Sequence, residues 1–320
     1  MPVEPHANGA SFFLLTDYGM EDELAGMLRA TLARLCPAAG VIDITHGIPA
    51  FDVRAGSFCL ERAVPYLGPG IVIAVVDPGV ATSRRAVAVQ VDPSRIAVPP
   101  DAPGGLAGPD GSHLPGSPGG PGFYIGPDNG LLARAVRLSG GAVAVVEIAT
   151  SGRSTFDGRD VFAPAAAKLF NGAPLRDLGD LVDPSTLVEL DDPLCETGSG
   201  TLRAEVTWVD RFGNVQLAAC PDDARASGID APDSVLWLEQ DRISELPERL
   251  LVQRVASYDA LATGELGLLV DANGHLAVVC RRRSAALLLG IVPGMVIALT
   301  AAERPQHDVG GQPVGGGLVR

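Results

Sequence analysis

The pair of residues best suited to chemistry is Asp77 and Arg84, which follow an apolar run at 71–76. This run is rich in β-branched residues and predicts a buried strand. Pro78 and Gly79 then force a turn, so Asp77 is expected at the carboxyl end of the strand, where open α/β sheets bind their ligands. A buried carboxylate needs a partner, and Arg84 is the nearest cation that could supply one in a fork geometry. The same two residues could equally form a structural ion pair that closes the strand.

Other carboxylates stand beside predicted strands and helices. Asp17 follows the predicted strand Ser11–Thr16 and is a candidate to accept hydrogen bonds from ribose hydroxyls. Asp22 could cap the helix that begins there, which is the more common use of such a residue. Asp157 and Asp160 precede an alanine-rich helix, and capping is again the simpler interpretation.

A turn in the carboxyl-terminal third contains Asp210, Phe212 and Asn214. Asp210 could bind an ammonium group, and Phe212 with the Asn214 amide could bind a flat heterocycle. Without any chemistry, the same residues would form a hairpin turn.

Familiar catalytic motifs are missing from the sequence: it has no Walker A loop, no GxSxG elbow and no HExxH. The five histidines are far apart and lack ligand spacing, so we expect no metal site. His46 is more typical of a core histidine than of a catalyst.

An alternation of strands and helices must position these residues. Strands are predicted at 11–16, 40–45, 71–76, 85–91, 123–125 and 143–149, and helices at 22–35, 53–66, 131–138 and 159–171. This order predicts an α/β domain with a doubly wound, mostly parallel sheet.

Composition suggests a division into two domains. The α/β domain is expected over residues 10–190, and a stretch rich in Pro, Gly, Ser and acidic residues at 191–200 marks its end. Short strand-like segments separated by turns then predict a smaller, all-β domain over 200–300. Residues 92–122, rich in Pro and Gly, are expected to form a surface insertion, and 301–320 a disordered tail.

Charge and composition exclude several classes of function. The net charge of −14 over 320 residues argues against a nucleic acid or a membrane surface as partner. The five cysteines are odd in number and show no CxxC spacing, which indicates a reducing compartment. With no signal-peptide pattern at the start and no apolar run of ~20 residues, we expect a cytoplasmic protein.

Taken together and in this order, six motifs resemble the S-adenosyl-L-methionine (SAM) hydroxide adenosyltransferases, which are related to the SAM-dependent chlorinases and fluorinases. The motifs are Thr16-Asp17-Tyr18-Gly19 with Asp22, Asp43-Ile44-Thr45-His46, Val76-Asp77-Pro78-Gly79-Val80 with Arg84, Pro127-Asp128-Asn129-Gly130, Thr155-Phe156-Asp157-Gly158-Arg159-Asp160 and Asp210-Arg211-Phe212-Gly213-Asn214. The resemblance covers residues 12–299. It implies an α/β domain followed by a β-barrel-like domain, and a homotrimer whose ligand lies between the first domain of one subunit and the second domain of the next.

The resemblance also implies roles for residues of the first domain. Asp17 would bind the ribose hydroxyls, with Asp22 also on the substrate side, and Phe51 would form an aromatic wall beside the ribose. Asp77 and Arg84 match two members of a hydrolytic triad. The third member, a histidine in the family, is replaced here by Asp157.

In the second domain, Asp210 would bind the methionine ammonium group, and Phe212 and Asn214 would line an adenine pocket. The family's Asn-Ser at the ligand is replaced by Asp271-Ala272, with Asn273 adjacent.

The function implied is hydrolysis of SAM by attack of water at ribose C5′, which gives adenosine and L-methionine. Asp77 would orient or deprotonate the water, and no metal or cofactor is required. Two alternatives stay open: a protein that binds SAM or adenosine with little turnover, and a SAM-dependent halogenase. A carboxylate beside the attack path repels halide, so Asp77 disfavours the second alternative.

Overall fold

The computed structural model describes residues 10–92, 120–150, 154–240 and 249–302. The predicted surface insertion at 92–122 and the predicted tail at 301–320 lie outside the described residues, apart from positions at their ends. The chain divides into two compact units, Met1–Asp192 (unit 1) and Pro193–Arg320 (unit 2), and each unit is described by itself.

Unit 1 is built on a seven-stranded sheet in the order β2-β1-β3-β5-β4-β6-β7. The strands are β1 (Ser11–Thr16), β2 (Gly40–Thr45), β3 (Gly70–Val75), β4 (Ala86–Val91), β5 (Phe123–Pro127), β6 (Ala142–Ile148) and β7 (Gly179–Val182). Pairing is parallel from β2 through β1 and β3 to β5, and antiparallel from β5 through β4 and β6 to β7. The predicted α/β fold class is therefore confirmed, and the antiparallel half is a detail that the alternation of elements did not reveal.

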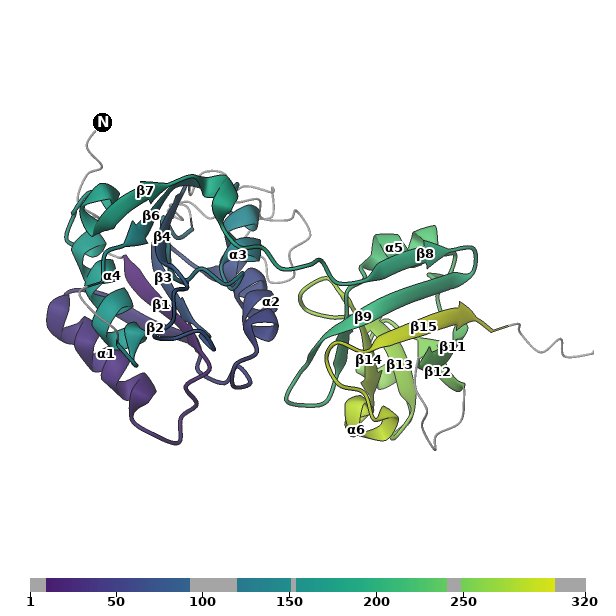
Figure 1. Cartoon of the computed structure of the whole chain (residues 1–320). Coiled ribbons are helices and arrows are strands. Elements are labelled where there is room, and N and C mark those ends of the chain that lie inside the picture. Colours follow the sequence, from purple (N-terminus) through teal and green to yellow (C-terminus); the bar gives the residue numbers. More distant parts are fainter. Residues whose placement is uncertain (1–9, 93–119, 151–153, 241–248, 303–320) are drawn as a thin grey trace, which may run out of the picture. The chain divides into compact units, whose positions relative to one another are not determined.

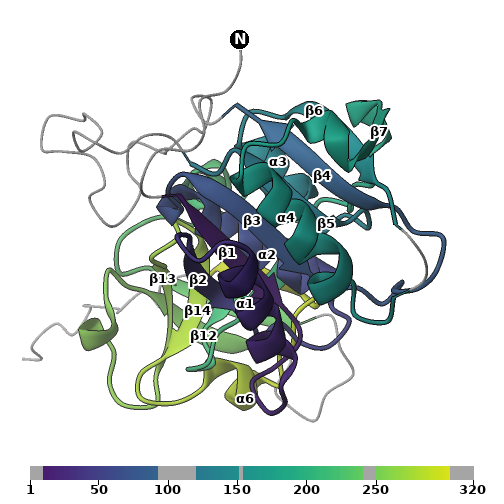
Figure 2. The ribbon, with the colours of Figure 1, turned by 90° about the vertical axis from the view of Figure 1, so that its left-hand side faces the viewer.

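Two pairs of helices cover the two faces of this sheet. Helix α1 (Leu24–Leu35) packs with α4 (Ala163–Phe170) on one face, and α2 (Val53–Ala63) packs with α3 (Ala133–Leu138) on the other (Figure 1). Figure 2 shows α1 and α4 side by side in front of the sheet. Because both faces are covered, β3 is buried along its whole length, as its continuous apolar run predicts.

The core between the sheet and the α1–α4 pair explains these helices. Leu28 and Leu32, one turn apart on α1, are fully buried against Phe12 of β1 and Ile73 of β3. The alanines of α4 let it approach the sheet closely, and they belong to the same core.

Two of the predicted helices change helix type along their length. The segment predicted at 53–66 ends its α-helix at Ala63 and continues as a 3₁₀ turn, Val64–Tyr66, because Pro65 lacks an amide hydrogen. The segment predicted at 159–171 begins with a π-helical turn, Gly158–Phe162, before α4. π-Helical turns are often found at functional sites.

Unit 2 is a closed β-barrel. Its strands are β8 (Cys195–Gly198), β9 (Thr201–Val209), β10 (Val215–Leu217), β11 (Val235–Gln240), β12 (Leu250–Arg254), β13 (Leu266–Val270), β14 (Leu276–Cys280) and β15 (Val296–Ala301). The order β10-β14-β13-β12-β11-β15-β9 returns to β10, which closes seven strands, and β8 adds to the outside of β9. This confirms the predicted all-β, barrel-like domain.

Alternating apolar residues fill the barrel. Leu236 and Leu238 of β11, Leu268 of β13 and Val278 of β14 are all buried in one core. Two short helices, α5 (Pro221–Ala226) and α6 (Ala285–Leu289), accompany the strands. In the part of the chain that the structure describes, no helix has the length and apolar character needed to cross a membrane.

Candidate functional site

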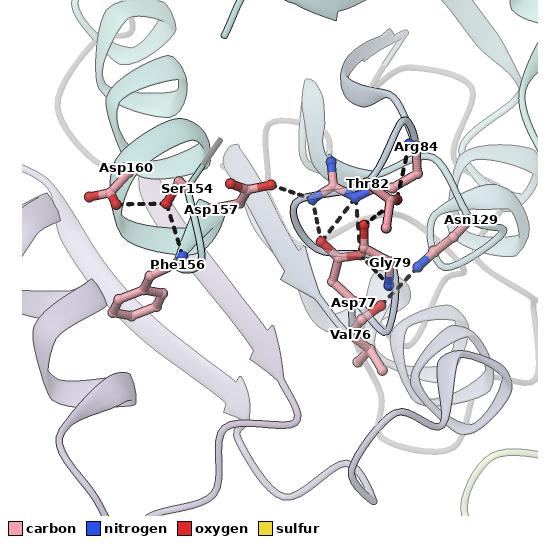
Figure 3. A network of polar contacts seen from close by, with 10 residues as sticks. All are labelled: Val76, Asp77, Gly79, Thr82, Arg84, Asn129, Ser154, Phe156, Asp157 and Asp160. Atoms are coloured by element: carbon pink, nitrogen blue, oxygen red, sulfur yellow. Dashed lines mark hydrogen bonds and ion pairs between the residues drawn. The ribbon is translucent and has the colours of Figure 1, made fainter. Parts of the chain in front are cut away.

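Asp77 lies two residues beyond β3, and its side chain is only 5% exposed. The amide of Gly79 donates to Asp77 Oδ1 (3.2 Å), and Thr82 Oγ1 donates to the Gly79 carbonyl oxygen (2.6 Å). The amide of Arg84 in turn donates to Thr82 Oγ1 (3.3 Å). These local hydrogen bonds fold the segment back, so Arg84 returns to the carboxylate that ends β3 (Figure 3).

The ion pair expected between Asp77 and Arg84 is present. Nε of Arg84 lies 3.0 and 2.9 Å from the two carboxylate oxygens, and Nη2 bonds Oδ2 as well. The guanidinium carbon also lies over the ring of Phe162, 5.5 Å from its centroid. This fork fixes the plane of the Asp77 carboxylate.

Asp157 joins the same guanidinium from the other side. One of its oxygens lies 2.5 Å from Nη2 of Arg84, and its side chain makes no capping hydrogen bond to the π-helical turn that follows. This corrects the capping interpretation for Asp157. One guanidinium is thus shared by two carboxylates that are nearly buried, and the cluster carries a net charge of −1.

Burial alone would lower the pKa of Arg84, but the hydrogen bonds and charges of Asp77 and Asp157 raise it above its usual value. The guanidinium therefore stays charged. Asp160, the other carboxylate of this segment, instead accepts from Ser154 Oγ (2.7 Å) (Figure 3). It also accepts from Nε of Arg159 (2.6 Å).

Asp17 lies at the carboxyl end of β1, next to β3 in the sheet. Its Oδ2 accepts a hydrogen bond from the amide of Phe51 (2.9 Å). Burial raises the pKa of Asp17, the Phe51 amide lowers it, and the negative charge of Asp77 raises it further. The structure therefore places Asp17, Phe51 and the Asp77–Arg84 pair in one neighbourhood.

Phe51 is held in an unusual position for a large apolar residue. Its ring is 71% exposed, and its backbone has φ +68°, a left-handed conformation that side chains other than glycine adopt at a cost. An exposed aromatic ring on a strained backbone beside a carboxylate is a typical feature of a ligand site.

Sequence reasoning gave Tyr18 no role of its own. Its ring packs edge-to-face on Phe156, with centroids 5.4 Å apart. A Cβ at Gly158 would lie 2.4 Å from the Tyr18 hydroxyl oxygen, so only glycine fits there. Burial raises the pKa of Tyr18, as do the charges of Asp17 and the nearby carboxylates. The phenol is therefore neutral, and its position after Asp17 in the first motif was the signal that could have identified it.

Asn129 also supports the site without having been predicted to. Its Nδ2 donates to the carbonyl oxygen of Val76 (2.9 Å), and its Oδ1 accepts from the amide of Leu131 (3.2 Å). The first contact fixes the residue before Asp77 (Figure 3).

Two other candidates have local or core contacts. Asp22 is exposed, and its Oδ1 accepts from the amide of Leu24 at the start of α1 (3.1 Å), which fits a helix-starting role. His46 is buried, with Nδ1 2.8 Å from Thr16 Oγ1 and Nε2 3.2 Å from Asp43 Oδ1. It fits the core histidine that its position predicts.

In unit 2, the carboxylate of Asp210 organises the turn between β9 and β10. Its Oδ1 accepts from the amides of Phe212 (2.8 Å) and Asn214 (2.9 Å), and its Oδ2 accepts from Asn214 Nδ2 (2.8 Å). The ring of Phe212 is 76% exposed. The hairpin interpretation is therefore correct for the backbone, and it leaves an aromatic ring uncovered at the tip of the turn.

A cavity of about 370 Å³ lies within unit 2 beside this turn. It is lined by Trp208, Asp210, Asn214, Gln216, Ala256, Ser257, Tyr258, Leu269, Val270, Asp271, Ala272, Asn273 and Ala277. Three of the residues that the resemblance points to, Asp210, Asn214 and Asn273, thus share one cavity. Its size and its aromatic walls are typical of a small-molecule site.

Within the described ranges, no three His, Cys, Asp or Glu side chains gather as they would around a metal ion. The candidate site is built from carboxylates, one guanidinium, aromatic rings and backbone amides.

Both units of the chain match domains of one known protein family. The SAM hydroxide adenosyltransferase N-terminal domain matches residues 12–107 and 119–179, and the C-terminal domain of the same family matches residues 204–298. The chain belongs to the SAM hydroxide adenosyltransferase family. This confirms the resemblance that the motifs indicated.

Several relatives of this family member have names that state an activity. A protein of Salinispora tropica named (R)-S-adenosyl-L-methionine hydrolase is 40% identical over 292 residues, which cover 89% of this chain and 96% of the relative. A Thermus thermophilus protein of the same name is 36% identical over 63% of this chain and 71% of its own length. A fluorinase of an Actinoplanes species is 25% identical over 92% of this chain and 99% of its own.

Among solved structures, an uncharacterized conserved protein from Thermotoga maritima is similar, with a TM-score of 0.73 and 27% identity. The match covers 90% of this chain and 99% of the Thermotoga protein. A conserved hypothetical protein from Thermus thermophilus matches with a TM-score of 0.64 and 30% identity over 91% of this chain and all of its own.

Proposed function

We propose that this protein hydrolyses S-adenosyl-L-methionine by attack of water at ribose C5′, and releases adenosine and L-methionine. One observation carries the proposal: Arg84 holds a buried carboxylate, Asp77, at the carboxyl end of a central strand. The name of the Salinispora tropica relative, 40% identical over nearly its whole length, supports it.

The main task of the protein in this reaction is to position the attacking water and a group that accepts its proton. In SAM the leaving group is a sulfonium, so methionine departs as a neutral sulfide when the bond between C5′ and sulfur breaks. The attacking water forms the new C5′–oxygen bond and loses one proton, for which the carboxylate of Asp77 is the acceptor. Arg84 keeps that carboxylate in plane, and its guanidinium does not lose its proton in proteins.

The charge of the site suits this substrate. The Asp77–Arg84–Asp157 cluster carries a net charge of −1, and Asp17 adds a further carboxylate nearby. A negative site attracts a cationic sulfonium and repels a halide ion. Hydrolysis is therefore favoured over the halide transfer that the name of the fluorinase relatives suggests.

The remaining residues have proposed roles in binding. Asp17 would accept hydrogen bonds from the ribose hydroxyls, Phe51 would cover the sugar, and Asp22 would lie on the substrate side. In unit 2, Asp210 would bind the ammonium group of the methionine arm. Phe212, Asn214 and Asn273 would line the part of the site around the adenine and that arm. No metal or cofactor enters this reaction.

We also propose a homotrimer whose active sites lie between subunits. The family resemblance is the reason, together with the division of the proposed ligand residues between unit 1 and unit 2. Light scattering of the purified protein tests this. A monomer with full activity would contradict it.

Isotope labelling of the water oxygen tests the proposed hydrolysis. The purified chain is incubated with SAM in water enriched in ¹⁸O, and adenosine and methionine are measured by mass spectrometry. Attack at C5′ places the label in the 5′-hydroxyl of adenosine, whereas attack on the methionine arm would release 5′-methylthioadenosine. No adenosine above the uncatalysed background would refute the proposal, and a 5′-halogenated product in added chloride or fluoride would replace it with halide transfer.

The configuration at sulfur needs its own assay. The L descriptor already fixes the α-carbon, so the R in the names of the relatives refers to the sulfonium centre. Parallel incubations with the two sulfonium epimers will show which one this chain uses. We expect the R epimer to react faster.

A further inference from the structure

Unit 2 contains the same turn twice. In the segment 210–214 the carboxylate of Asp210 accepts two amides, from the residues two and four positions later. In the segment 271–275 the carboxylate of Asp271 does the same, with the amides of Asn273 (2.8 Å) and His275 (2.9 Å). Each turn has a glycine at its fourth position, Gly213 at φ +83° and Gly274 at φ +81°. In both, the amide of that glycine donates to the carbonyl oxygen of the aspartate.

The two turns connect β9 to β10 and β13 to β14, and β10 pairs with β14 in antiparallel fashion. Asp210 and Asp271 both line one cavity, the one of about 370 Å³ described above. Its other walls combine aromatic and apolar residues, Trp208, Tyr258 and Leu269 among them, with neutral polar ones. The polar ones are Asn214, Gln216, Ser257 and Asn273.

No cation among the described residues of the cavity is paired with either carboxylate. Oδ2 of Asp271 accepts from Gln216 Nε2 (2.5 Å), and Oδ2 of Asp210 accepts from Asn214 Nδ2 (2.8 Å); both donors are neutral side-chain amides. None of the lining residues, all of which the structure describes, is Lys, Arg or His. Burial is the main cause that raises the pKa of Tyr258, and the charges of Asp210 and Asp271 raise it further.

This charge is at odds with an amino acid as the ligand of the cavity. The methionine arm of SAM ends in an ammonium group, which suits a carboxylate, and in an α-carboxylate, which does not. With one carboxylate in the cavity, the ammonium would find a partner and the α-carboxylate could remain at a distance. With two carboxylates lining the same cavity and no cation, like charge disfavours an α-carboxylate there.

We propose that Asp271 makes this enzyme prefer sulfonium nucleosides whose aminoalkyl arm has an ammonium group and lacks the α-carboxylate. The inference rests on the proposed function, because it takes the substrate to be an adenosyl sulfonium whose arm enters the cavity of unit 2. It concerns the arm only, and it is independent of how the bond at C5′ breaks. Asp271 acts here as a specificity-determining residue.

Binding measured without turnover tests the proposal. The probes are two sulfides that lack the sulfonium leaving group, S-adenosyl-L-homocysteine and the same molecule without its carboxylate, S-adenosyl-3-thiopropylamine. Isothermal titration calorimetry with the full chain gives the ratio of their dissociation constants. We expect the amine to bind the wild type at least about tenfold more tightly, a difference of about 1.4 kcal/mol.

Asp271→Asn keeps an oxygen to accept the two turn amides and removes the charge, so it should reduce that ratio to about twofold or less. Asp222→Asn, which removes the same charge from an exposed position on α5 paired with Arg225, is the matched control and should keep the wild-type ratio. Thermal unfolding of each variant verifies that it is folded. If Asp271→Asn fails to fold, the wild-type ratio still decides the outcome.

Three results would overturn the proposal: equal or tighter binding of the amino acid by the wild type, an unchanged ratio in folded Asp271→Asn, or binding of neither probe. These outcomes are separate from the hydrolysis assay. Adenosine release from SAM together with a ratio near one would refute the preference and leave the hydrolysis intact. A tenfold ratio without adenosine release would support the preference and refute the hydrolysis.

Discussion

The same nitrogen of Arg84, Nη2, bonds one oxygen of Asp77 and one oxygen of Asp157. The two carboxylates come from segments far apart in the sequence, yet the guanidinium holds them in one cluster. Any change at one carboxylate therefore alters the electrostatic surroundings of the other. Several expected outcomes depend on this arrangement.

Asp77→Asn should reduce kcat for adenosine release by about 10²–10⁴-fold, because the amide cannot accept the proton of the attacking water. Binding of the non-reacting S-adenosyl-L-homocysteine should change little. Asp160→Asn is the control, since Asp160 bonds Ser154 and Arg159 outside the cluster. Full turnover in Asp77→Asn would reduce Asp77 to a structural role.

Asp157→His should raise the rate near neutral pH. An ordinary carboxyl is almost fully ionised and weakly basic at about pH 7, whereas a histidine titrates close to it and can relay a proton. Turnover of both forms is measured from mildly acidic to mildly basic pH. Overlapping profiles would show that position 157 takes no part in proton transfer.

Arg84→Met should destabilise the fold by about 3–5 kcal/mol, because it leaves two nearly buried carboxylates without a cation. The triple variant Arg84→Met, Asp77→Asn, Asp157→Asn removes the unpaired charges and should recover part of that loss. Chemical denaturation measures both. A single variant as stable as the wild type would show that water already solvates the cluster.

Asp17→Asn should make unit 1 more stable near neutral pH while it weakens ribose binding. Burial is the main reason why the pKa of Asp17 in the folded chain lies above the ordinary 3.8, so the folded state binds more protons than the unfolded state between the two values. Unfolding free energy from this group therefore falls as pH rises through the folded-state pKa. The gain in the variant should be present at pH 7 and vanish below the ordinary value.

Asp183→Asn provides a control of opposite sign. Hydrogen bonds from the backbone and side chain of Ser185 lower the pKa of Asp183, so its stabilisation is present above its ordinary pKa and is lost as pH falls through the folded-state value. Thermal unfolding across pH 3–8 compares the two variants. Shifts of the same sign in both would contradict the assignment for Asp17.

The paired turns of unit 2 allow a matched test of packing. Gly213 and Gly274 have nearly the same φ, but a Cβ at Gly213 would lie 1.9 Å from Ser284 Oγ, and a Cβ at Gly274 meets nothing within 4 Å. Gly274→Ala should cost about 1–2 kcal/mol for the left-handed backbone alone. Gly213→Ala should cost a further ~1–3 kcal/mol for the steric overlap. Equal losses would mean that Ser284 moves away freely.

The sequence predicted those strands whose residues and bordering turns are adjacent in the chain. The bounds of β1 and β2 were predicted correctly, because each is a short apolar or alternating run between turn residues. Strand β7 was missed, since two of its four residues are exposed and it lacks a continuous apolar run.

The contacts of the site also differ in how local they are. The pairing of Asp77 with Arg84 followed from a turn of a few residues. The contact between Arg84 and Asp157 spans 73 positions and followed only from the family resemblance. The place of Tyr18 against Gly158 and Phe156 depends on tertiary packing, which no local pattern encodes.

The topology of the barrel affects the order in which the chain can fold. Strand β15 lies between β9 and β11, and it pairs Thr300 with Thr201 at the opposite end of the unit. The barrel therefore cannot close until nearly all of unit 2 has been synthesised, whereas the sheet of unit 1 is complete at Val182. During synthesis, a finished α/β unit would precede an open sheet with exposed edges. A chain that stops before β15 would thus keep the Asp77–Arg84 pair and lose the scaffold of both aspartate turns.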